Sequence, residues 1–385
     1  MKSGFRVFDA DLHTIEPDDL WSRHLDERYR TLAPRPRPAA GSPHPTTKER
    51  HEHYRKASAA GYDPPSHLQA MAIEGIDVAV LFGTRGRHVQ MHDDIDPSFA
   101  DALARAHNDW THDFCSHDPQ RLKFAAQIAY HDVGLAVKEV KRAVEQLGAV
   151  AVIGNPNPVN GQHIHDPYFE PLWQAIEDLG VPVCFHPTGV WTLRDDIGRR
   201  FIDHSGGRLI ADAARNPLEL MLAFASLVAG GVLERHPGLT CAFLEGGCGW
   251  VPWWLWRLDD TYEKFPEDLD VPLALRPSDY FHRQCYVSAD AGEQYLAEVV
   301  AAIGDTRIVM ATDYPHRDSM FPDAVSTFVA RQDLSMQTKS RILWNNGARL
   351  YRRAMADAQP APVDALSKST QPSPVNGADR VYDTG

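Results

Sequence analysis

Residues 6–13 read RVFDADLH, a short apolar run that leads into the acidic and imidazole side chains of Asp9, Asp11 and His13. Seven more short apolar runs follow, most of them separated by helix-sized segments. Their apolar character is largely continuous rather than alternating, which is typical of parallel strands covered on both faces. The eight predicted strands are Arg6–Asp9, Asp77–Phe82, Lys123–Ala129, Ala149–Ile153, Pro182–Phe185, Thr240–Leu244, Gln284–Ser288 and Arg307–Ala311.

Helical patterns lie between these runs, and the clearest are Pro97–Cys115, Gly134–Leu147, Pro167–Leu179 and Glu293–Ile303. Strands that alternate with helices form βα units, and eight such units fit a closed barrel. The sequence therefore predicts the α/β class and a single (β/α)8 TIM barrel. A doubly wound open sheet is the structural alternative, because spacing alone does not exclude it.

Two segments fall outside the alternation of strands and helices. Residues 32–65 are rich in proline and charge and predict an inserted loop with one helix, which covers the barrel mouth or an interface. Residues 355–385 are rich in Ala, Pro, Ser and Asp without periodicity, and they predict a disordered tail. We therefore expect one metal-dependent barrel over residues 1–354, with the insertion at 32–65, followed by the tail at 355–385.

Composition excludes several classes of protein. Hydrophobic residues make up 43% and charged residues 24% of the 385, as in ordinary globular domains. The formal net charge of −13 argues against nucleic acid as a partner. No apolar stretch is long enough to cross a bilayer, and the first residues lack the apolar core of a signal peptide. The five cysteines are scattered and odd in number, so we expect no disulfide framework and a cytoplasmic location.

Polar side chains end several of the predicted strands. Asp11 and His13 follow the first run, His186 the fifth, Glu245 the sixth and Asp313 the eighth. In a TIM barrel the carboxyl ends of the strands meet at the active-site face. One Asp or His at a strand end is usually a cap or turn residue, whereas the two His and two Asp together form a ligand set suited to Zn²⁺ or another divalent ion.

The same residues carry a resemblance to a known family. Asp-x-His at the first strand, Phe-His186-Pro, Glu245-Gly-Gly with Trp250 and Pro252, and Thr-Asp313-Tyr-Pro-His316 resemble the amidohydrolase superfamily. Within it, the chain is most similar to the branch related to aminocarboxymuconate semialdehyde decarboxylase. The segment Arg341–Tyr351 resembles the usual final helix of that branch. The similarity spans roughly residues 5 to 352, and its specificity comes from the order and spacing of the motifs.

The resemblance implies one divalent metal at the mouth of the barrel, held by Asp11, His13, His186 and Asp313. The first of these positions is His in the His-x-His members, and Asp adds negative charge there. Zn²⁺ is the expected ion, and the added charge favours harder ions such as Mn²⁺ as the alternative. Glu245 is a sharper departure, because many decarboxylase relatives carry His near this stage of the barrel. A carboxylate there could accept a proton or bind the ion, but it could not supply the charge of an imidazolium.

Asp313, Glu245 and His186 are the expected catalytic residues, and four more are candidates for substrate binding: Glu16, Arg85, Arg87 and His316. Glu16 lies three residues beyond His13, and capping a loop is an equal alternative for it. Arg85 and Arg87 follow the second strand, where a guanidinium could hold a substrate carboxylate or pair with local acids. His316 resembles a family position, so contact with the substrate is the interpretation we weigh for it.

The resemblance favours non-oxidative decarboxylation of a small carboxylated aromatic or unsaturated acid. The alternative enzyme is a metal-dependent hydrolase of an amide, ester, lactone or C–C bond, in which Asp313 shuttles the proton with help from Glu245. A barrel that only binds ligands is the third hypothesis, and loss of metal ligands would be its signature. The expected partners are a small-molecule substrate and, because the branch commonly forms dimers, a second copy of the chain.

Overall fold

The computed structural model describes residues 1–34, 52–86, 92–187, 194–316 and 318–355. It contains one sheet of eight parallel strands in the order β1 to β8. Backbone hydrogen bonds also join β1 to the segment after β8, from Asp313 N to Asp11 O (3.1 Å) and from His13 N to Tyr314 O (2.7 Å). The sheet is therefore closed, which confirms the TIM barrel and excludes the open doubly wound sheet.

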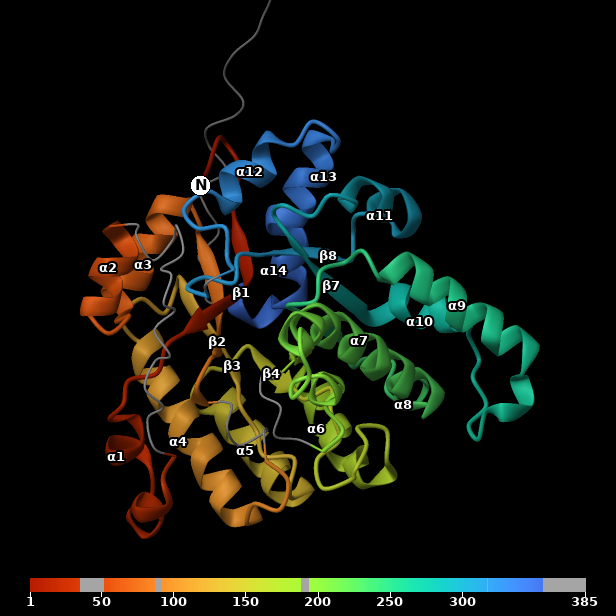
Figure 1. The fold of residues 1–385 in the computed structure, drawn as a ribbon, viewed down its shortest axis with the longest axis horizontal. Helices are drawn as coiled ribbons and strands as arrows, with labels where there is room; N and C mark the ends of the chain where they lie inside the picture. Colours follow the sequence, from red (N-terminus) through yellow and green to blue (C-terminus); the bar gives the residue numbers. More distant parts are fainter. Residues whose placement is uncertain (35–51, 87–91, 188–193, 317, 356–385) are drawn as a thin grey trace, which may run out of the picture.

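The strands occupy the centre of Figure 1 and the helices surround them. The strands are β1 (Phe8–Thr14), β2 (Val78–Gly83), β3 (Leu122–Ala126), β4 (Ala151–Gly154), β5 (Val183–Phe185), β6 (Cys241–Phe243), β7 (Cys285–Asp290) and β8 (Ile308–Ala311). The α-helices are α1 (Leu20–His24), α2 (Glu52–Ala59), α3 (Pro64–Glu74), α4 (Pro97–Cys115), α5 (Val133–Glu145), α6 (Glu170–Leu179), α7 (Gly207–Ala229), α8 (Val232–Arg235), α9 (Val251–Lys264), α10 (Pro277–Gln284), α11 (Leu296–Ile303), α12 (Ala324–Ala330), α13 (Met336–Ser340) and α14 (Asn346–Leu350).

The hydrophobic core has two main layers because each strand buries both of its faces. One layer fills the barrel and includes Phe8, Val80 and Ile153, closed at one end by Tyr351 after α14. The other lies between the strands and the helices and includes Phe124 and Trp173. The five cysteines are buried and form no disulfides, as expected from the sequence.

Local sequence signals explain the best-predicted helix. α4 spans Pro97–Cys115, as its pattern predicts. The Asp96 carboxylate caps its first turn by accepting from Phe99 N (2.9 Å), and proline occupies the first helical position.

Other predicted boundaries differ from those of the structure. The Pro167–Leu179 pattern divides into a 3₁₀ turn at Pro167–Phe169 and α6. The predicted first strand, Arg6–Asp9, is wrong in extent, since β1 continues to Thr14.

The predicted insertion is only partly visible. Residues 35–51 lie outside the described part of the chain, as do residues 356–385 of the predicted tail. The helix expected within the insertion is α2, which packs against the segment after β8. His53 Nε2 lies 2.9 Å from the Tyr314 hydroxyl, and the Tyr54 hydroxyl lies 3.1 Å from Ser319 Oγ. None of the helices in the described ranges is long and apolar enough to cross a membrane.

Candidate metal centre and active site

A β-bulge in β1 sets the direction of the first site residues. Asp9 pairs with Ala79 but Leu12 pairs with Leu81, so β1 holds one extra residue between these pairs. Bulges re-aim side chains in this way beside active sites. Asp11 and His13 point into the barrel mouth, whereas Asp9 accepts hydrogen bonds from Asp11 N (3.2 Å), Thr312 N (3.1 Å) and the Thr312 hydroxyl. Regular alternation along the strand would place Asp9, Asp11 and His13 on one face, and the bulge instead separates Asp9 from the other two.

The structure brings the four expected metal ligands together at the ends of β1, β5 and β8. The two imidazoles approach with their Nε2 atoms 3.1 Å apart. His13 Nε2 lies 3.4 Å from Asp11 Oδ1 and 3.3 Å from Asp313 Oδ1, and His186 Nε2 lies 3.4 Å from Asp11 Oδ2. Asp11, His13 and His186 are fully buried. The ligand atoms of these three residues all lie close enough to share one ion.

The protonation pattern of this cluster favours a cation between its members. His186 Nδ1 lies 3.0 Å from Pro187 O, which can only accept, so the proton of the neutral ring is on Nδ1 and Nε2 carries a lone pair. Burial and the nearby His316 lower the pKa of His13 to about 3, so this ring is neutral as well. Neither buried oxygen of Asp11 accepts a hydrogen bond within the described residues. Lone pairs that converge without protons fit a divalent ion bound by nitrogen and oxygen.

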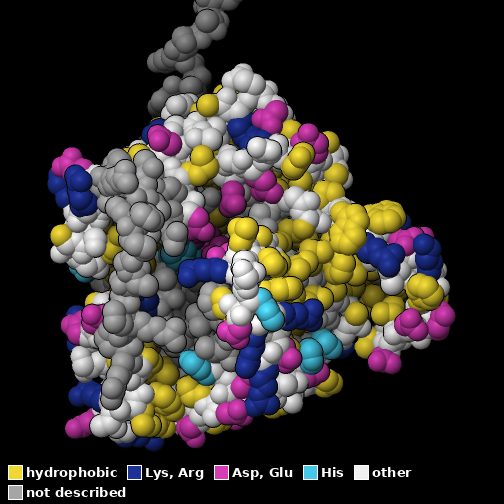
Figure 2. All heavy atoms as spheres, in the orientation of Figure 1, with side chains coloured by type: hydrophobic (Ala, Val, Ile, Leu, Met, Phe, Trp, Pro, Cys, Tyr) yellow, Lys and Arg dark blue, Asp and Glu magenta, His cyan; other side chains and the backbone are white. Residues whose placement is uncertain are grey.

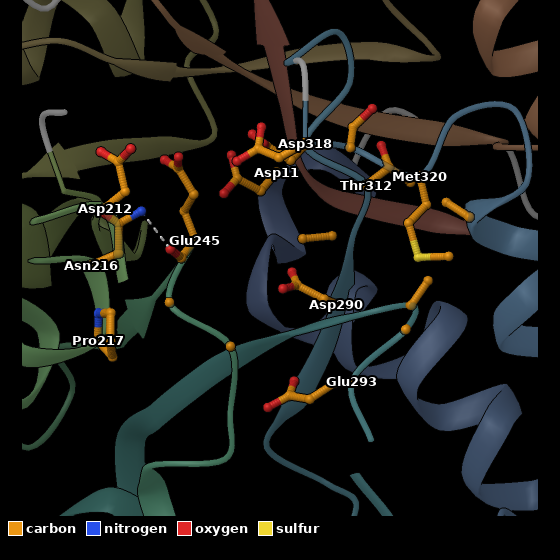
Figure 3. Close-up of a pocket in the computed structure, with 18 of the residues that line it drawn as sticks. Asp11, Asp212, Asn216, Pro217, Glu245, Asp290, Glu293, Thr312, Asp318 and Met320 are labelled. Atoms are coloured by element: carbon orange, nitrogen blue, oxygen red, sulfur yellow. Dashed lines mark hydrogen bonds between the residues drawn. The ribbon is translucent and has the colours of Figure 1, made fainter. Parts of the chain in front are cut away.

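Glu245 joins this cluster from the end of β6. Its Oε2 lies 2.9 Å from His186 Nε2, and its backbone is fixed from two sides. Glu245 N donates to Ser288 Oγ (3.1 Å). Glu245 O accepts from Asn216 Nδ2 (2.9 Å), and Figure 3 shows this second bond. Its φ of 58° is in the left-handed region, as is the φ of 55° at Asp313. Two non-glycine residues with this backbone strain at one site are typical of a functional constraint.

Asp313 has the electrostatics of a proton carrier. Burial raises its pKa to about 7, aided by the charges of Glu245 and Asp11 and opposed by His316. His316 Nδ1 lies 2.7 Å from Asp313 Oδ1. A carboxyl group whose pKa lies near neutrality can both give and take a proton at physiological pH.

Glu16 and Arg85 lie beside this centre but face other partners. The Glu16 carboxylate accepts from the backbone N–H groups of Thr84 (3.0 Å), Arg85 (2.7 Å) and Gly86 (2.9 Å). It also accepts from His107 Nε2 (3.1 Å), so its contacts order the loop after β2. The Arg85 side chain is exposed and lies 3.4 Å from Asp18. Arg87 is outside the described residues.

Glu16 gives the loop a pH-dependent stability. Burial alone would raise its pKa, but the hydrogen bond and charge of His107, with the amides of Arg85 and Gly86, lower it to about 2. We expect Glu16→Gln to cost about 3 kcal/mol of unfolding free energy at pH 7, because the new NH₂ group opposes N–H donors. A depressed pKa stabilises above the unfolded value, so the difference from wild type should shrink as pH falls from about 4.5 towards 2. Urea unfolding of wild type and Glu16→Gln across this pH range measures the difference. The exposed Glu145→Gln is the control, and an equal effect there would contradict the assignment.

A cavity of about 520 Å³ opens beside the four expected metal ligands, and Asp11 and Asp313 are part of its lining. Seven of its lining residues are acidic and, within the described part of the chain, none is Lys or Arg. Figure 3 shows Asp11, Glu245 and Asp290 approaching the same space from three different elements. Burial raises the pKa of Asp290 to about 6, reinforced by the charges of Glu293 and Glu245. Sequence reasoning missed Asp290 because the predicted seventh strand stopped at Ser288, whereas β7 reaches Asp290.

Comparisons with known proteins identify the family of this chain. A family model described as "Amidohydrolase" matches residues 9–353. The chain is 25% identical over 267 residues to 2-amino-3-carboxymuconate-6-semialdehyde decarboxylase of Dictyostelium discoideum, covering 68% of this chain and 69% of the relative. It is 24% identical over 264 residues to gamma-resorcylate decarboxylase of Polaromonas sp., covering 67% and 78%.

Among solved structures, a dihydroxybenzoic acid decarboxylase from Polaromonas sp. JS666, with bound manganese and the inhibitor 2-nitroresorcinol, superposes with a TM-score of 0.69. The two chains are 20% identical, and the match covers 90% of this chain and 97% of the other. At this identity the superposition supports the barrel fold, whereas the family match extends over nearly the whole catalytic barrel. This chain therefore belongs to the amidohydrolase family.

Proposed function

We propose that the protein is a metal-dependent, non-oxidative decarboxylase of a small carboxylated aromatic or unsaturated acid. The convergence of Asp11, His13, His186 and Asp313 beside a 520 Å³ cavity carries this proposal. The decarboxylases among the relatives favour carbon–carbon cleavage over other metal-assisted chemistry. A divalent ion bound there would supply positive charge that holds the substrate carboxylate and an adjacent oxygen.

The protein's own residues would handle the proton. When the bond to the carboxyl carbon breaks, CO₂ leaves and the electron pair stays on the substrate carbon. Asp313, whose pKa is raised by burial and by the charges of Glu245 and Asp11, is the carboxyl group that would donate a proton to that carbon. Glu245, whose Oε2 lies 2.9 Å from His186 Nε2, carries a negative charge that raises the pKa of Asp313 and so favours its protonated form.

The charge of the cavity narrows the choice of substrate. Asp290, Glu293 and Asp318 line it beyond the four expected metal ligands, so a second substrate carboxylate would face like charges. Hydroxyl or amino groups would instead find acceptors there. A monocarboxylic acid that carries such donors fits the cavity better than a dicarboxylic acid.

Hydrolysis of an ester, amide, lactone or C–C bond is the second candidate. The observation that favours it is Glu245, since a carboxylate beside a metal site can act as a general base towards water. Both candidates need the same ion. Zn²⁺ is the expected ion, and Mn²⁺ is supported as the alternative by the acidic ligand set and by the manganese in the Polaromonas structure.

We also propose that the protein forms a homodimer and is located in the cytoplasm. Two helices carry exposed apolar side chains at Leu218, Leu222, Trp253 and Trp256, and Figure 2 shows apolar surface over α7 and α9. A patch of this kind supports an interface with a second copy. The absence of disulfides among the cysteines is consistent with a reducing compartment.

Metal analysis followed by a substrate panel tests the function. The purified chain, stripped and reloaded with Mn²⁺ or Zn²⁺, should hold about one ion per chain by elemental analysis. It should then release CO₂ from hydroxylated or aminated benzoates and not from their methyl esters, which lack the leaving carboxylate. Turnover of the esters or of lactones without CO₂ would favour the hydrolase. No bound ion with either metal would contradict both enzymes.

A further inference from the structure

The hydroxyl of Thr84 lies between two imidazoles of the site. Thr84 directly follows β2, and its Oγ1 is 3.3 Å from His13 Nδ1 and 3.0 Å from His316 Nε2. His316 Nδ1 in turn lies 2.7 Å from Asp313 Oδ1. These contacts form a chain from one expected metal ligand, through Thr84 and His316, to another.

The chain has one consistent direction. If His13 binds an ion through Nε2, its ring proton is on Nδ1 and donates to Thr84 Oγ1. The single hydroxyl proton of Thr84 then donates to His316 Nε2. His316 consequently carries its proton on Nδ1, where it donates to the Asp313 carboxylate. Each donor in this chain fixes the tautomer of the next ring.

The loop that carries Thr84 is fixed by hydrogen bonds from its backbone. Its backbone N–H groups converge on the Glu16 carboxylate, which is itself buried. A Cβ at Gly83 would come within 2.5 Å of His107 Nε2 and 2.8 Å of Glu16 Oε1, so only glycine permits this approach. A hydroxyl on such a loop has a defined position, which is what precise orientation of a neighbouring ring requires.

We propose that Thr84 is a positioning residue that holds His316 in its Nδ1–H tautomer and thereby orients Asp313 for proton transfer. The proposal rests on the function proposed above. Thr84 itself contacts imidazoles rather than the reacting atoms, so it acts through His316. Loss of the hydroxyl leaves His316 Nε2 without this donor and lets the ring rotate away from Asp313.

Two substitutions at Thr84 and one matched control test this role. Thr84→Val removes the hydroxyl at nearly constant shape, and Thr84→Ser retains it. Thr14→Val is the control, because Thr14 is a buried threonine on the neighbouring strand whose hydroxyl donates only to a backbone carbonyl, Phe82 O (3.3 Å). All three are made in the 385-residue chain.

The first readout is independent of activity. In ¹⁵N-histidine-labelled, Zn²⁺-loaded protein, the ¹⁵N shifts of His316 should report a protonated Nδ1 in wild type, Thr84→Ser and Thr14→Val. Thr84→Val should instead show a mixture of tautomers. An unchanged His316 tautomer in Thr84→Val would overturn the proposal, as would the same mixture in Thr14→Val.

The second readout separates turnover from binding. With a substrate found in the panel, Thr84→Val should lower kcat about 10- to 100-fold at nearly constant KM, and Thr84→Ser should recover most of it. Equal losses in Val and Ser would contradict a role for the hydroxyl. If wild type binds no metal, the proposed function is contradicted, and this outcome is distinct from a failure of the Thr84 proposal. The Thr84 contact is then decided in metal-free protein, where the His316 tautomer should still differ between wild type and Thr84→Val because only wild type has the hydroxyl at 3.0 Å from Nε2.

Discussion

His186→Ala should lose its bound metal and its activity together. The side chain is fully buried, and its Nε2 is the point where the other site residues meet. It lies 3.1 Å from His13 Nε2, 3.4 Å from Asp11 Oδ2 and 2.9 Å from Glu245 Oε2. Removing the ring deletes one expected ligand and leaves the carboxylates of Asp11 and Glu245 without the nitrogen that both of them contact. An ion that contributes several kcal/mol to the transition state should then be lost, with about a 1,000-fold or larger fall in kcat/KM.

Elemental analysis and kinetics of wild type and His186→Ala, purified identically, check this result. The control is His112→Ala, since His112 Nδ1 also contacts a backbone carbonyl, Leu147 O (2.8 Å), but lies on α4 away from the cluster. Circular dichroism should show that both variants remain folded. A His186→Ala protein with full metal content and turnover would remove His186 from the site, whereas equal losses in both variants would point to general destabilisation.

The barrel was predictable because its strands are buried on both faces. The second predicted strand, Asp77–Phe82, differs from β2 by one residue at each end, since its apolar run coincides with its burial. β1 was the hardest strand to predict, because Asp9, Asp11 and His13 interrupt its apolar pattern. Polar residues in a fully buried strand are explained by the site that they build, and sequence periodicity does not contain that information.

The site was predictable to the extent that it lies at strand ends. Asp11, His13, His186, Glu245 and Asp313 occupy such ends and meet in space. Thr84 carried no signal, because a hydroxyl in a loop is common and its importance depends on two histidines far away in sequence. The bulge that turns Asp9 away was equally invisible, since it arises from how β1 pairs with β2.

Glu245→Gln should keep the metal and lose turnover. Asp11, His13, His186 and Asp313 remain in this variant, so we expect near-wild-type metal content. The lost charge should lower kcat about 100-fold, within the usual range for a group that assists proton transfer. Because the Glu245 charge adds to burial in raising the pKa of Asp313, its removal lowers that pKa below about 7. Activity that requires protonated Asp313 falls as pH rises through this pKa, so the fall should move to lower pH.

Profiles of kcat against pH for wild type, Glu245→Gln and Asp212→Asn measure this effect. Asp212 lines the same cavity from α7, but its side chain is 52% exposed, so the variant removes one cavity charge in well-solvated surroundings. Its profile should match wild type because water screens that charge. Loss of the metal in Glu245→Gln would instead make Glu245 a ligand and overturn the role given to it. An unshifted profile with normal kcat would show that Glu245 contributes neither to the pKa of Asp313 nor to turnover.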